Sequence, residues 1–391
     1  MKILFLVSTD PRQTRHGGEQ RVHFVWEGLK KLGNVYTVYP VAWKSLEKRD
    51  DADRIYAVQL ERRYSPAWFL KRMMRAWNNH IMPPYYLTDK RIWKMGLPKP
   101  DVCVVRPASV AYGLDLLDRF PCFVDMDDIP SAEVEMMEKN FGRSFKTWLS
   151  LRLLERMQRV ICRKARHVWI ADEEELPRFA GTSVSFLPNI PVPPLPDFAD
   201  CLGNENNLFF VGSLNSPPNF IALDWFLDNV WNEAKSVFPN LRLDIGGGGL
   251  PQRYKEKWAS CRDVRLLGRV DDLRPYYKKA LAIVAPMRIG SGTCLKVLEA
   301  LRMGRPLLST QQGLRGIRRE YRNADNGIFP FEDAESFVAA MKSLLQCDRL
   351  ATQRKAVSFV EMRNNQVFID STLRTDILGK DDEVERQLIY S

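Results

Sequence analysis

Short apolar segments alternate with longer segments of helical periodicity through the first half of the chain. The apolar and β-branched runs predict strands at Ile3–Ser8, Val35–Val41, Asp101–Val105, Cys122–Asp125, His167–Ala171 and Val184–Leu187. Segments with helical spacing of apolar residues lie between them, for example Gly18–Leu32 and Phe145–Ala165. Strands that alternate with helices in this way predict an α/β domain built on a parallel sheet.

A proline-rich segment from Asn189 to Asn207 interrupts the alternation. It contains four prolines and no usable periodicity, which is typical of an interdomain linker. A second series follows, with strands predicted at Leu208–Val211, Leu241–Ile245, Val264–Leu267, Ala282–Ala285 and Pro306–Ser309. Helices are predicted between them at Pro218–Val237, Pro251–Ser260, Leu273–Ala280 and Gly292–Met303, and the pattern after Phe331 is helical.

The two series predict two doubly wound, Rossmann-like α/β domains that face each other across a cleft. We expect an N-terminal domain over 1–188, a linker over 189–207 and a C-terminal domain over 208–360. We expect residues 361–391 to be helical and to cross back to the N-terminal domain. Ligands of such sheets bind beyond the carboxyl ends of the strands.

Composition narrows the protein class. The chain has 391 residues, of which 45% are hydrophobic and 27% charged, as in ordinary soluble proteins. No apolar run approaches the length of a membrane span, and the run Ile3–Val7 is too short for a signal-peptide core. The seven cysteines form no C-x-x-C pair and no histidines lie at metal-ligand spacing, so we expect a cytoplasmic protein without a metal site.

The positive charge is concentrated in two segments. The net charge is +10, and residues 62–99 hold nine Lys and Arg against one acid, interleaved with Trp and Tyr. The second segment places Arg152, Arg156, Arg159, Arg163 and Arg166 on one stripe of a predicted helix. Basic residues beside aromatic rings favour contact with an anionic membrane surface, so we expect peripheral binding at the inner membrane face, although the stripe also fits a solvated helix. No recognised nucleic-acid module is present, and no nucleic-acid partner is expected.

The segment Val284–Gly313 carries the most informative motif. A predicted strand ends at Pro286, a loop with Gly290 and Gly292 follows, and a helix comes next. Glycines allow a backbone to approach a phosphate closely, and the amides at a helix start favour anions. Lys296 lies one turn into the helix and Glu299 follows three residues later. A cation beside a carboxylate suits a nucleoside diphosphate, because the cation can bind the phosphate and the carboxylate can bind a ribose hydroxyl.

The pattern P-x-R-x-G-S-G-T-x-L-K-x-L-E-A-L in this segment resembles the family 4 glycosyltransferases, also called group 1 glycosyl transferases, which have the GT-B fold. The segments Phe209–Leu227, Leu241–Gly249 and Val264–Ala280 resemble further units of that family's second domain, and Leu187–Val192 its crossover. The resemblance is weaker in the first half, where it rests on the opening strand and the pair Gly17-Gly18.

The resemblance implies a retaining transfer of sugar from a nucleotide-sugar to an acceptor hydroxyl, without a metal or other cofactor. It implies that Glu299 binds the ribose, that Lys296 adds positive charge, and that Gly17 and Gly18 approach the phosphates. The remaining donor-binding candidates are Arg288, Gly290, Ser291 and Gly292 in the loop, the amides of Thr293, Cys294 and Leu295, and Gly268, Arg269 and Val270 near the base.

Two departures from the family pattern leave other functions open. The family often has a glutamate eight positions before Glu299, where this chain has Ser291. It also often has an Arg and a Lys after the first strand of the second domain, whereas the loop Gly212–Asn219 has no cation. Arg288 and Lys296 are the candidate replacements. The alternatives are a degenerate, non-catalytic subunit that binds a glycan or nucleotide, and a sugar-nucleotide epimerase of the same fold.

Acidic residues follow a predicted strand of the first domain. Asp127 and Asp128 belong to the segment Asp125–Ser131, at a strand end where a site is expected. They are candidate catalytic residues that bind sugar or acceptor hydroxyls, beside the alternative that they cap the next helix. The resemblance implies a glycosyltransferase in which the domain over 1–188 binds the acceptor and the domain over 208–360 binds the nucleotide-sugar donor. Together with the basic, aromatic segments, it leads us to expect a glycan acceptor that is a lipid-linked precursor of a surface polysaccharide.

Overall fold

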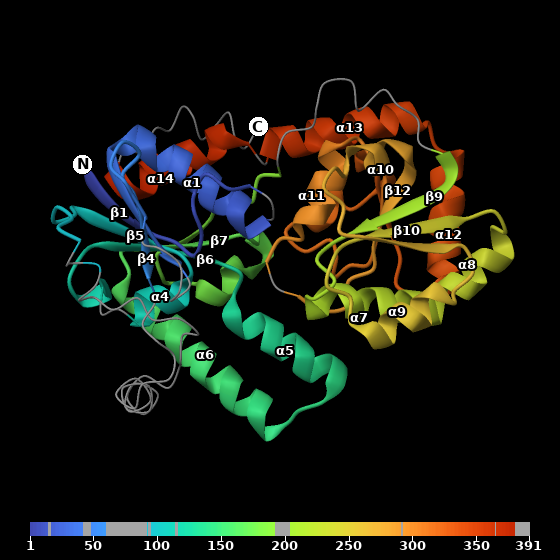
Figure 1. Ribbon diagram of the computed structural model, residues 1–391, viewed down its shortest axis with the longest axis horizontal. Helices are drawn as coiled ribbons and strands as arrows, with labels where there is room; N and C mark the ends of the chain where they lie inside the picture. Colours follow the sequence, from blue (N-terminus) through green and yellow to red (C-terminus); the bar gives the residue numbers. More distant parts are fainter. Residues whose placement is uncertain are drawn as a thin grey trace. The chain divides into compact units, whose positions relative to one another are not determined.

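Two α/β units make up the chain, and each contains one sheet covered by helices (Figure 1). Unit 1 comprises Met1–Ile190 and Asn365–Ser391, and unit 2 comprises Pro191–Asn364. The computed structural model describes residues 1–14, 17–41, 48–59, 92, 95–113, 116–191, 204–290, 292–363 and 365–379. The predicted fold class of two α/β domains with parallel sheets is confirmed.

The sheet of unit 1 has eight strands in the order β3-β4-β2-β1-β5-β6-β7-β8. Its strands are β1 (Lys2–Leu6), β2 (Asn34–Val41), β3 (Lys48–Asp50), β4 (Ile55–Gln59), β5 (Val102–Val105), β6 (Cys122–Asp127), β7 (His167–Ile170) and β8 (Val184–Phe186). All neighbours are parallel except β3 and β4, which pair antiparallel. The six predicted strands are present. Two strands at the sheet edge, β3 and β4, were not predicted, and β3 is short and polar.

Helices cover both faces of this sheet because its central strands are apolar on both sides. Ile3 and Phe5 of β1 are buried in a core with α1 (Gly17–Leu32) and α14 (Gln366–Leu378). Leu4 and Leu6 point to the opposite core. The other helices of unit 1 are α4 (Ala108–Gly113), α5 (Pro130–Phe141) and α6 (Phe145–Lys164), with 3₁₀ turns at Leu116–Asp118 and Glu173–Phe179.

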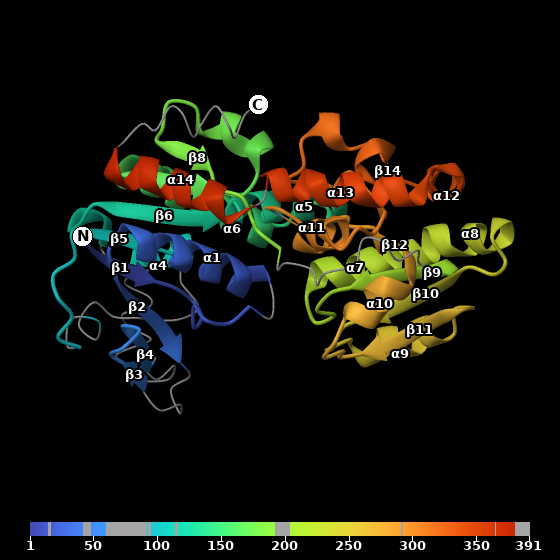
Figure 2. The same cartoon turned by 90° about the horizontal axis from the view of Figure 1, so that it is seen from above.

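The C-terminal helix α14 belongs to unit 1 and lies beside α1 (Figure 2). A Cβ atom on Gly28 of α1 would lie 2.8 Å from the Leu373 side chain of α14, so a larger residue at this position would have to displace that side chain. Trp169 of β7 donates a hydrogen bond of 2.7 Å to Asp376. The last helix therefore packs on the first unit of the chain, after the whole of unit 2 has intervened in sequence.

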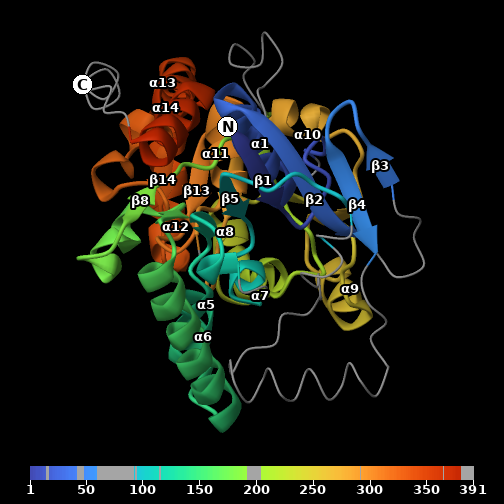
Figure 3. The same cartoon turned by 90° about the vertical axis from the view of Figure 1, so that its left-hand side faces the viewer.

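Helices α5 and α6 form a hairpin that projects away from the sheet of unit 1 (Figure 3). Ser144 caps α6 by accepting a hydrogen bond from the amide of Thr147. The Thr147 hydroxyl donates in turn to Glu138 of α5 at 2.8 Å. The hairpin exposes apolar side chains at this end, with Phe145 76% and Leu149 41% exposed.

The sheet of unit 2 has six parallel strands in the order β11-β10-β9-β12-β13-β14. They are β9 (Asn204–Val211), β10 (Arg242–Gly246), β11 (Val264–Gly268), β12 (Ala280–Ala285), β13 (Leu307–Ser309) and β14 (Ile328–Pro330). The central strand β12 is buried along its whole length. β9 begins three residues before the predicted end of the linker, and β14 was not predicted.

The helices of unit 2 follow the prediction with small shifts. They are α7 (Pro217–Phe226), α8 (Asn232–Val237), α9 (Gln252–Ala259), α10 (Arg274–Lys279), α11 (Leu295–Arg302), α12 (Ala334–Gln346) and α13 (Arg349–Arg363). A π-helical turn at Leu227–Trp231 separates α7 from α8, which were predicted as one helix. The helix predicted to start at Gly292 begins at Leu295, because the preceding residues form the glycine loop. Across the described residues of both units, no helix is long and apolar enough to cross a membrane.

Candidate functional site

The candidate donor site lies at the carboxyl ends of β9, β12 and β13 in unit 2. β9 and β12 are neighbours in the sheet, and β13 follows β12 on its other side. The loop after β9 begins at Gly212, and the loop after β12 holds Gly290 and Gly292 before α11 starts. Parallel pairing brings these loops to one edge of the sheet, where ligands of doubly wound sheets bind.

Lys296 is the central cation of this edge. Its ammonium group donates a hydrogen bond to the side-chain oxygen of Asn219, lies 3.7 Å from Met287 Sδ and lies 4.4 Å from the ring centroid of Phe210. A Cβ on Gly212 would lie 3.1 Å from Lys296 Nζ. Lys296 therefore reaches the loop that lacks its own cation. Burial lowers the pKa of Lys296 to about 8, so the ammonium group is predominantly charged at neutral pH.

Glu299 follows Lys296 by three residues on α11 and lies next to a buried tyrosine. Tyr277 of α10 is 2% exposed. Burial, and then the neighbouring carboxylate of Glu299, raise the pKa of Tyr277 well above its usual value. The tyrosine therefore stays protonated, with its hydroxyl beside Glu299.

The glycine loop is held by a second turn, which follows β13. Gln312 donates a hydrogen bond of 2.9 Å to the carbonyl of Gly290. Gly290 has φ of 135°, a conformation that side chains rarely adopt. Gly316, with φ of 82°, packs so closely on Thr293 that a Cβ would lie 2.5 Å from its hydroxyl. Contacts with residues 312–316 thus hold Gly290 and Thr293 in place.

The other predicted donor residues have the following positions. Cys294 is buried at the N-cap of α11, directly before Leu295, and the first amides of a helix lack carbonyl partners within it. The Arg288 guanidinium lies 3.3 Å from the Glu332 carboxylate and its Cζ lies 4.4 Å from the centroid of the Trp225 ring. These two contacts direct the side chain toward α7 and the end of β14. Ser291 lies outside the described residues.

Gly268, Arg269 and Val270 lie at the carboxyl end of β11, the edge strand of unit 2. Gly268 has φ of 68° and its carbonyl accepts a hydrogen bond of 2.8 Å from the amide of Gly247. Arg269 is 83% exposed and pairs loosely with Asp271 at 3.7 Å. These residues share the sheet edge with Lys296, separated from it by β10 and β9.

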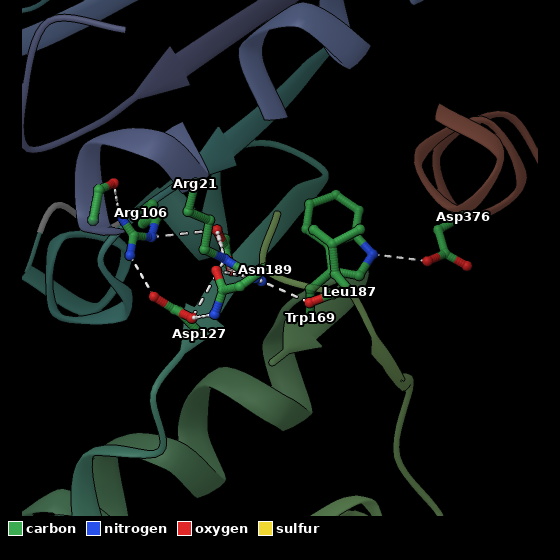
Figure 4. A network of polar contacts seen from close by, with 9 residues as sticks. Arg21, Arg106, Asp127, Trp169, Leu187, Asn189 and Asp376 are labelled. Carbon is green, nitrogen blue, oxygen red and sulfur yellow. Dashed lines mark hydrogen bonds and ion pairs between the residues drawn. The ribbon is translucent and has the colours of Figure 1, made fainter. Parts of the chain in front are cut away.

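In unit 1, Asp127 belongs to a buried ion-pair network (Figure 4). Its carboxylate pairs with Arg106, lies 3.5 Å from Arg21 Nε and accepts a hydrogen bond of 3.2 Å from Asn189. Burial alone would raise the pKa of Asp127, but Arg21 and Arg106 outweigh burial and lower it. Asp127 is therefore an ionised acceptor with several protein partners, and its backbone has φ of 51°.

Arg21 and Asp125 form the centre of the same network. Both side chains are fully buried, and Arg21 donates to the Asp125 carboxylate at 2.7 Å. Arg21 also donates to the carbonyl of Leu187 at 2.9 Å and to Asn189 at 3.1 Å. These bonds join α1 and β6 to the segment that leaves β8.

Gly17 and Gly18 form the start of α1, and the Gly18 carbonyl accepts a hydrogen bond of 2.9 Å from Arg106. Asp128 is exposed next to Asp127. The structure thus brings Gly18 and Asp127 together through Arg106, at the carboxyl edge of the unit 1 sheet. Sequence reasoning missed Arg21 and Arg106, although Arg106 directly follows a predicted strand.

Of the two basic segments, the structure describes the arginine stripe of residues 152–166 in full and the segment 62–99 only in part. Arg152, Arg156, Arg159, Arg163 and Arg166 are all exposed, while Met157 and Ile161 on the other side of α6 are buried. Arg166 lies beyond the end of α6 at Lys164, so the helical stripe has four arginines and not five. Of the segment 62–99, only 92 and 95–99 are described. No group of three or more His, Cys, Asp or Glu suited to a metal occurs in the described ranges.

Comparison with known proteins identifies the type of domain in unit 2. Residues 205–347 match the sequence model of the family described as glycosyl transferases group 1. Over most of its length, unit 2 is thus similar to the glycosyl transferases group 1 domain. The matched residues include the glycine loop, Lys296 and Glu299, so the candidate donor site lies within this domain.

Solved structures share the fold of the whole chain. Sucrose-phosphate synthase from Thermosynechococcus elongatus is 15% identical with a TM-score of 0.68, and each chain is covered completely. Anabaena HepE in complex with UDP and glucose is 12% identical, with a TM-score of 0.61 over 97% of this chain and 100% of that one. An Escherichia coli trehalose-6-phosphate protein bound to UDP-2-fluoroglucose is 10% identical, with a TM-score of 0.63 over 97% and 99%. The chain therefore has the GT-B fold.

One sequence relative comes from Klebsiella pneumoniae and is described as an uncharacterized 44.6 kDa protein in the cps region. It is 30% identical over 118 residues, which is 28% of this chain and 30% of the relative. The match thus spans less than a third of either protein.

Proposed function

We propose that this protein is a retaining glycosyltransferase of family 4, which transfers a sugar from a nucleoside diphosphate-sugar to an acceptor hydroxyl. The observation that carries the proposal is the position of Lys296. It follows the glycine loop in sequence and contacts Asn219 close to Gly212, within the segment that matches the group 1 model. Lys296 and the first amides of α11 supply positive charge where a diphosphate leaving group needs it. That HepE and the trehalose-6-phosphate protein were solved with UDP ligands supports a nucleotide-sugar donor.

The proposed reaction is a front-face substitution. The acceptor hydroxyl attacks the anomeric carbon from the side on which the diphosphate leaves, and the bond from that carbon to the β-phosphate oxygen breaks. The departing phosphate oxygen accepts the hydroxyl proton, so no side chain has to act as base. Lys296 stabilises the charge that develops on the β-phosphate, while Glu299 binds the ribose. Because the protein's own cations carry this charge, we expect the reaction to proceed without a metal ion.

Unit 1 is the proposed acceptor-binding unit. Its ion-pair network keeps Asp127 ionised at a carboxyl sheet edge, where a carboxylate accepts hydrogen bonds from sugar hydroxyls. A cps-region relative supports an acceptor in the synthesis of a surface polysaccharide. We infer that this acceptor is lipid-linked, with the cytoplasmic protein held peripherally on the inner membrane face.

The α5–α6 hairpin supports such membrane contact. It combines exposed arginines along α6 with exposed Phe145 and Leu149 near its tip. The rings of Phe145 and Trp148 are 5.8 Å apart and form one aromatic cluster. Arginines favour anionic headgroups and aromatic rings favour the depth just below them.

The test is a panel of UDP-, GDP- and ADP-sugars, incubated with the protein and a membrane-lipid extract in the presence of EDTA. We expect release of one nucleoside diphosphate that depends on the extract, with an anomeric configuration retained in the product by NMR. Release of free sugar without extract would instead indicate the epimerase. Nucleotide binding without any turnover would indicate the non-catalytic subunit.

A further inference from the structure

A second cation lies at the donor site and was not singled out from the sequence. Arg315 lies in the turn after β13, between the buried residues Leu314 and Ile317. Its neighbour Gly316 packs on Thr293, and Gln312 bonds to Gly290. The backbone on both sides of Arg315 is therefore anchored, and the side chain is directed to the glycine loop.

The guanidinium of Arg315 lies against the backbone of Gly290. A Cβ on Gly290 would lie 2.6 Å from Arg315 Nη2 and 2.9 Å from its Cζ. Any side chain at position 290 would thus displace the guanidinium, even apart from the positive φ of this residue. The glycine creates room for a cation as well as for a ligand.

Few groups of the described residues interact with the Arg315 guanidinium. Its Nη1 donates to the carbonyl of Gln312 at 2.7 Å, and its buried Nε has no hydrogen-bond partner within the part of the chain that the structure describes. Among the described residues, no carboxylate lies within ion-pair distance of it. Arg288, in contrast, is neutralised by Glu332. A buried guanidinium nitrogen without an acceptor is unfavourable unless a ligand supplies one.

The two cations also influence each other. The charge of Arg315 helps to lower the pKa of Lys296, so their charged groups lie close enough to repel. Two repelling cations beside a glycine loop and a helix start are typical of a site that binds a multiply charged anion. A guanidinium suits phosphate because two of its N–H groups bond to two oxygens.

We propose that Arg315 and Lys296 together bind the diphosphate of the donor, and that Arg315 replaces a cation absent from the loop Gly212–Asn219. This inference rests on the proposed function. It places one cation on each side of the glycine loop, with Lys296 reaching from α11 toward β9 and Arg315 from the turn after β13.

Isothermal titration with UDP, GDP, ADP, the matching nucleosides and inorganic pyrophosphate tests this role. For Arg315→Gln we expect affinity for the bound diphosphate and for pyrophosphate to fall about 10- to 100-fold. Affinity for the nucleoside should change less than about twofold, because the base and ribose contacts remain. Arg315→Lys should recover part of the loss. The matched control is Arg318→Gln, which removes an exposed arginine paired with Glu320 in the same segment.

The outcomes separate the two proposals. Unchanged diphosphate affinity in a folded Arg315→Gln protein would overturn the role of Arg315 and leave the donor site intact. An equal loss of nucleoside and diphosphate affinity would show a structural role and also overturn it. If the wild-type protein binds neither pyrophosphate nor any nucleoside diphosphate, both this inference and the proposed function fail.

Discussion

The ammonium group of Lys296 donates a hydrogen bond to the side-chain oxygen of Asn219, which joins the start of α11 to the first turn of α7, directly after the loop that follows β9. This bond fixes a charged group where the carboxyl ends of two adjacent strands meet. The same bond keeps the ammonium group close to Gly212. Preorganised charge of this kind stabilises a leaving group without rearrangement.

Lys296→Ala should therefore lower the turnover number about 100- to 1,000-fold. The thermal unfolding midpoint should not fall, because the substitution removes a buried charge and leaves the helix start unchanged. Steady-state kinetics with the active nucleotide-sugar measure this effect. Full turnover by folded Lys296→Ala protein would remove Lys296 from the mechanism.

The lowered pKa of Lys296 predicts how donor affinity depends on pH. Below a pH of about 8 the free protein already carries the charge, whereas above it the ammonium group must take up a proton when the diphosphate binds. Affinity should thus fall by up to about tenfold per pH unit above pH 8. Calorimetry in buffers of different ionisation enthalpy should detect the proton uptake. Lys296→Arg is the control, because arginine stays charged and should give a flat profile over this range.

Stability of unit 1 should depend on the buried pair Arg21 and Asp125. Without Arg21, the buried Asp125 carboxylate is left with the longer contact to Arg106 Nε, at 3.4 Å, so Arg21→Met should lower the free energy of unfolding by about 3–5 kcal/mol. The double variant Arg21→Met/Asp125→Leu should lose less than the sum of the two single variants. Urea unfolding followed by circular dichroism gives both values. A loss below about 1 kcal/mol in the single variant would contradict this role of the network.

Membrane binding should depend on the arginines of α6. The triple variant Arg152→Glu/Arg156→Glu/Arg159→Glu should lower the affinity for phosphatidylglycerol vesicles by about 100-fold or more, since each basic residue contributes about 1 kcal/mol. Co-sedimentation with the vesicles measures this affinity. Arg242→Glu/Arg262→Glu/Lys342→Glu alters the net charge equally through exposed residues of unit 2 and should have little effect. Phe145→Ser should weaken binding at high salt, where charge is screened. Equal loss in both triple variants would exclude the hairpin as the specific contact.

The strands and the glycine loop were predictable because their signals are local. Each predicted strand is a short apolar run, and each is present within a few residues of its predicted bounds. The loop before α11 was visible from Gly290 and Gly292, which are spaced for a close backbone turn. The pattern missed β4, although Ile55–Gln59 is largely apolar.

The partners of the candidate site residues were not predictable, because they come from distant segments. Asp127 was chosen from its position after a strand, but its pairing with Arg21 and Arg106 requires α1, β5 and β6 to meet. Arg315 lies in a turn without a motif, and only the fold places it against Gly290. The direction of Lys296 also depends on β9 and β12 being neighbours.

The most direct test of the central claim is calorimetric binding of UDP, GDP and ADP to wild-type protein and to Lys296→Ala, without metal. The account predicts that one diphosphate binds the wild-type protein and that the substitution weakens this binding at least about tenfold. Binding of none of the three to cooperatively folded wild-type protein, or equal binding to both proteins, would contradict it.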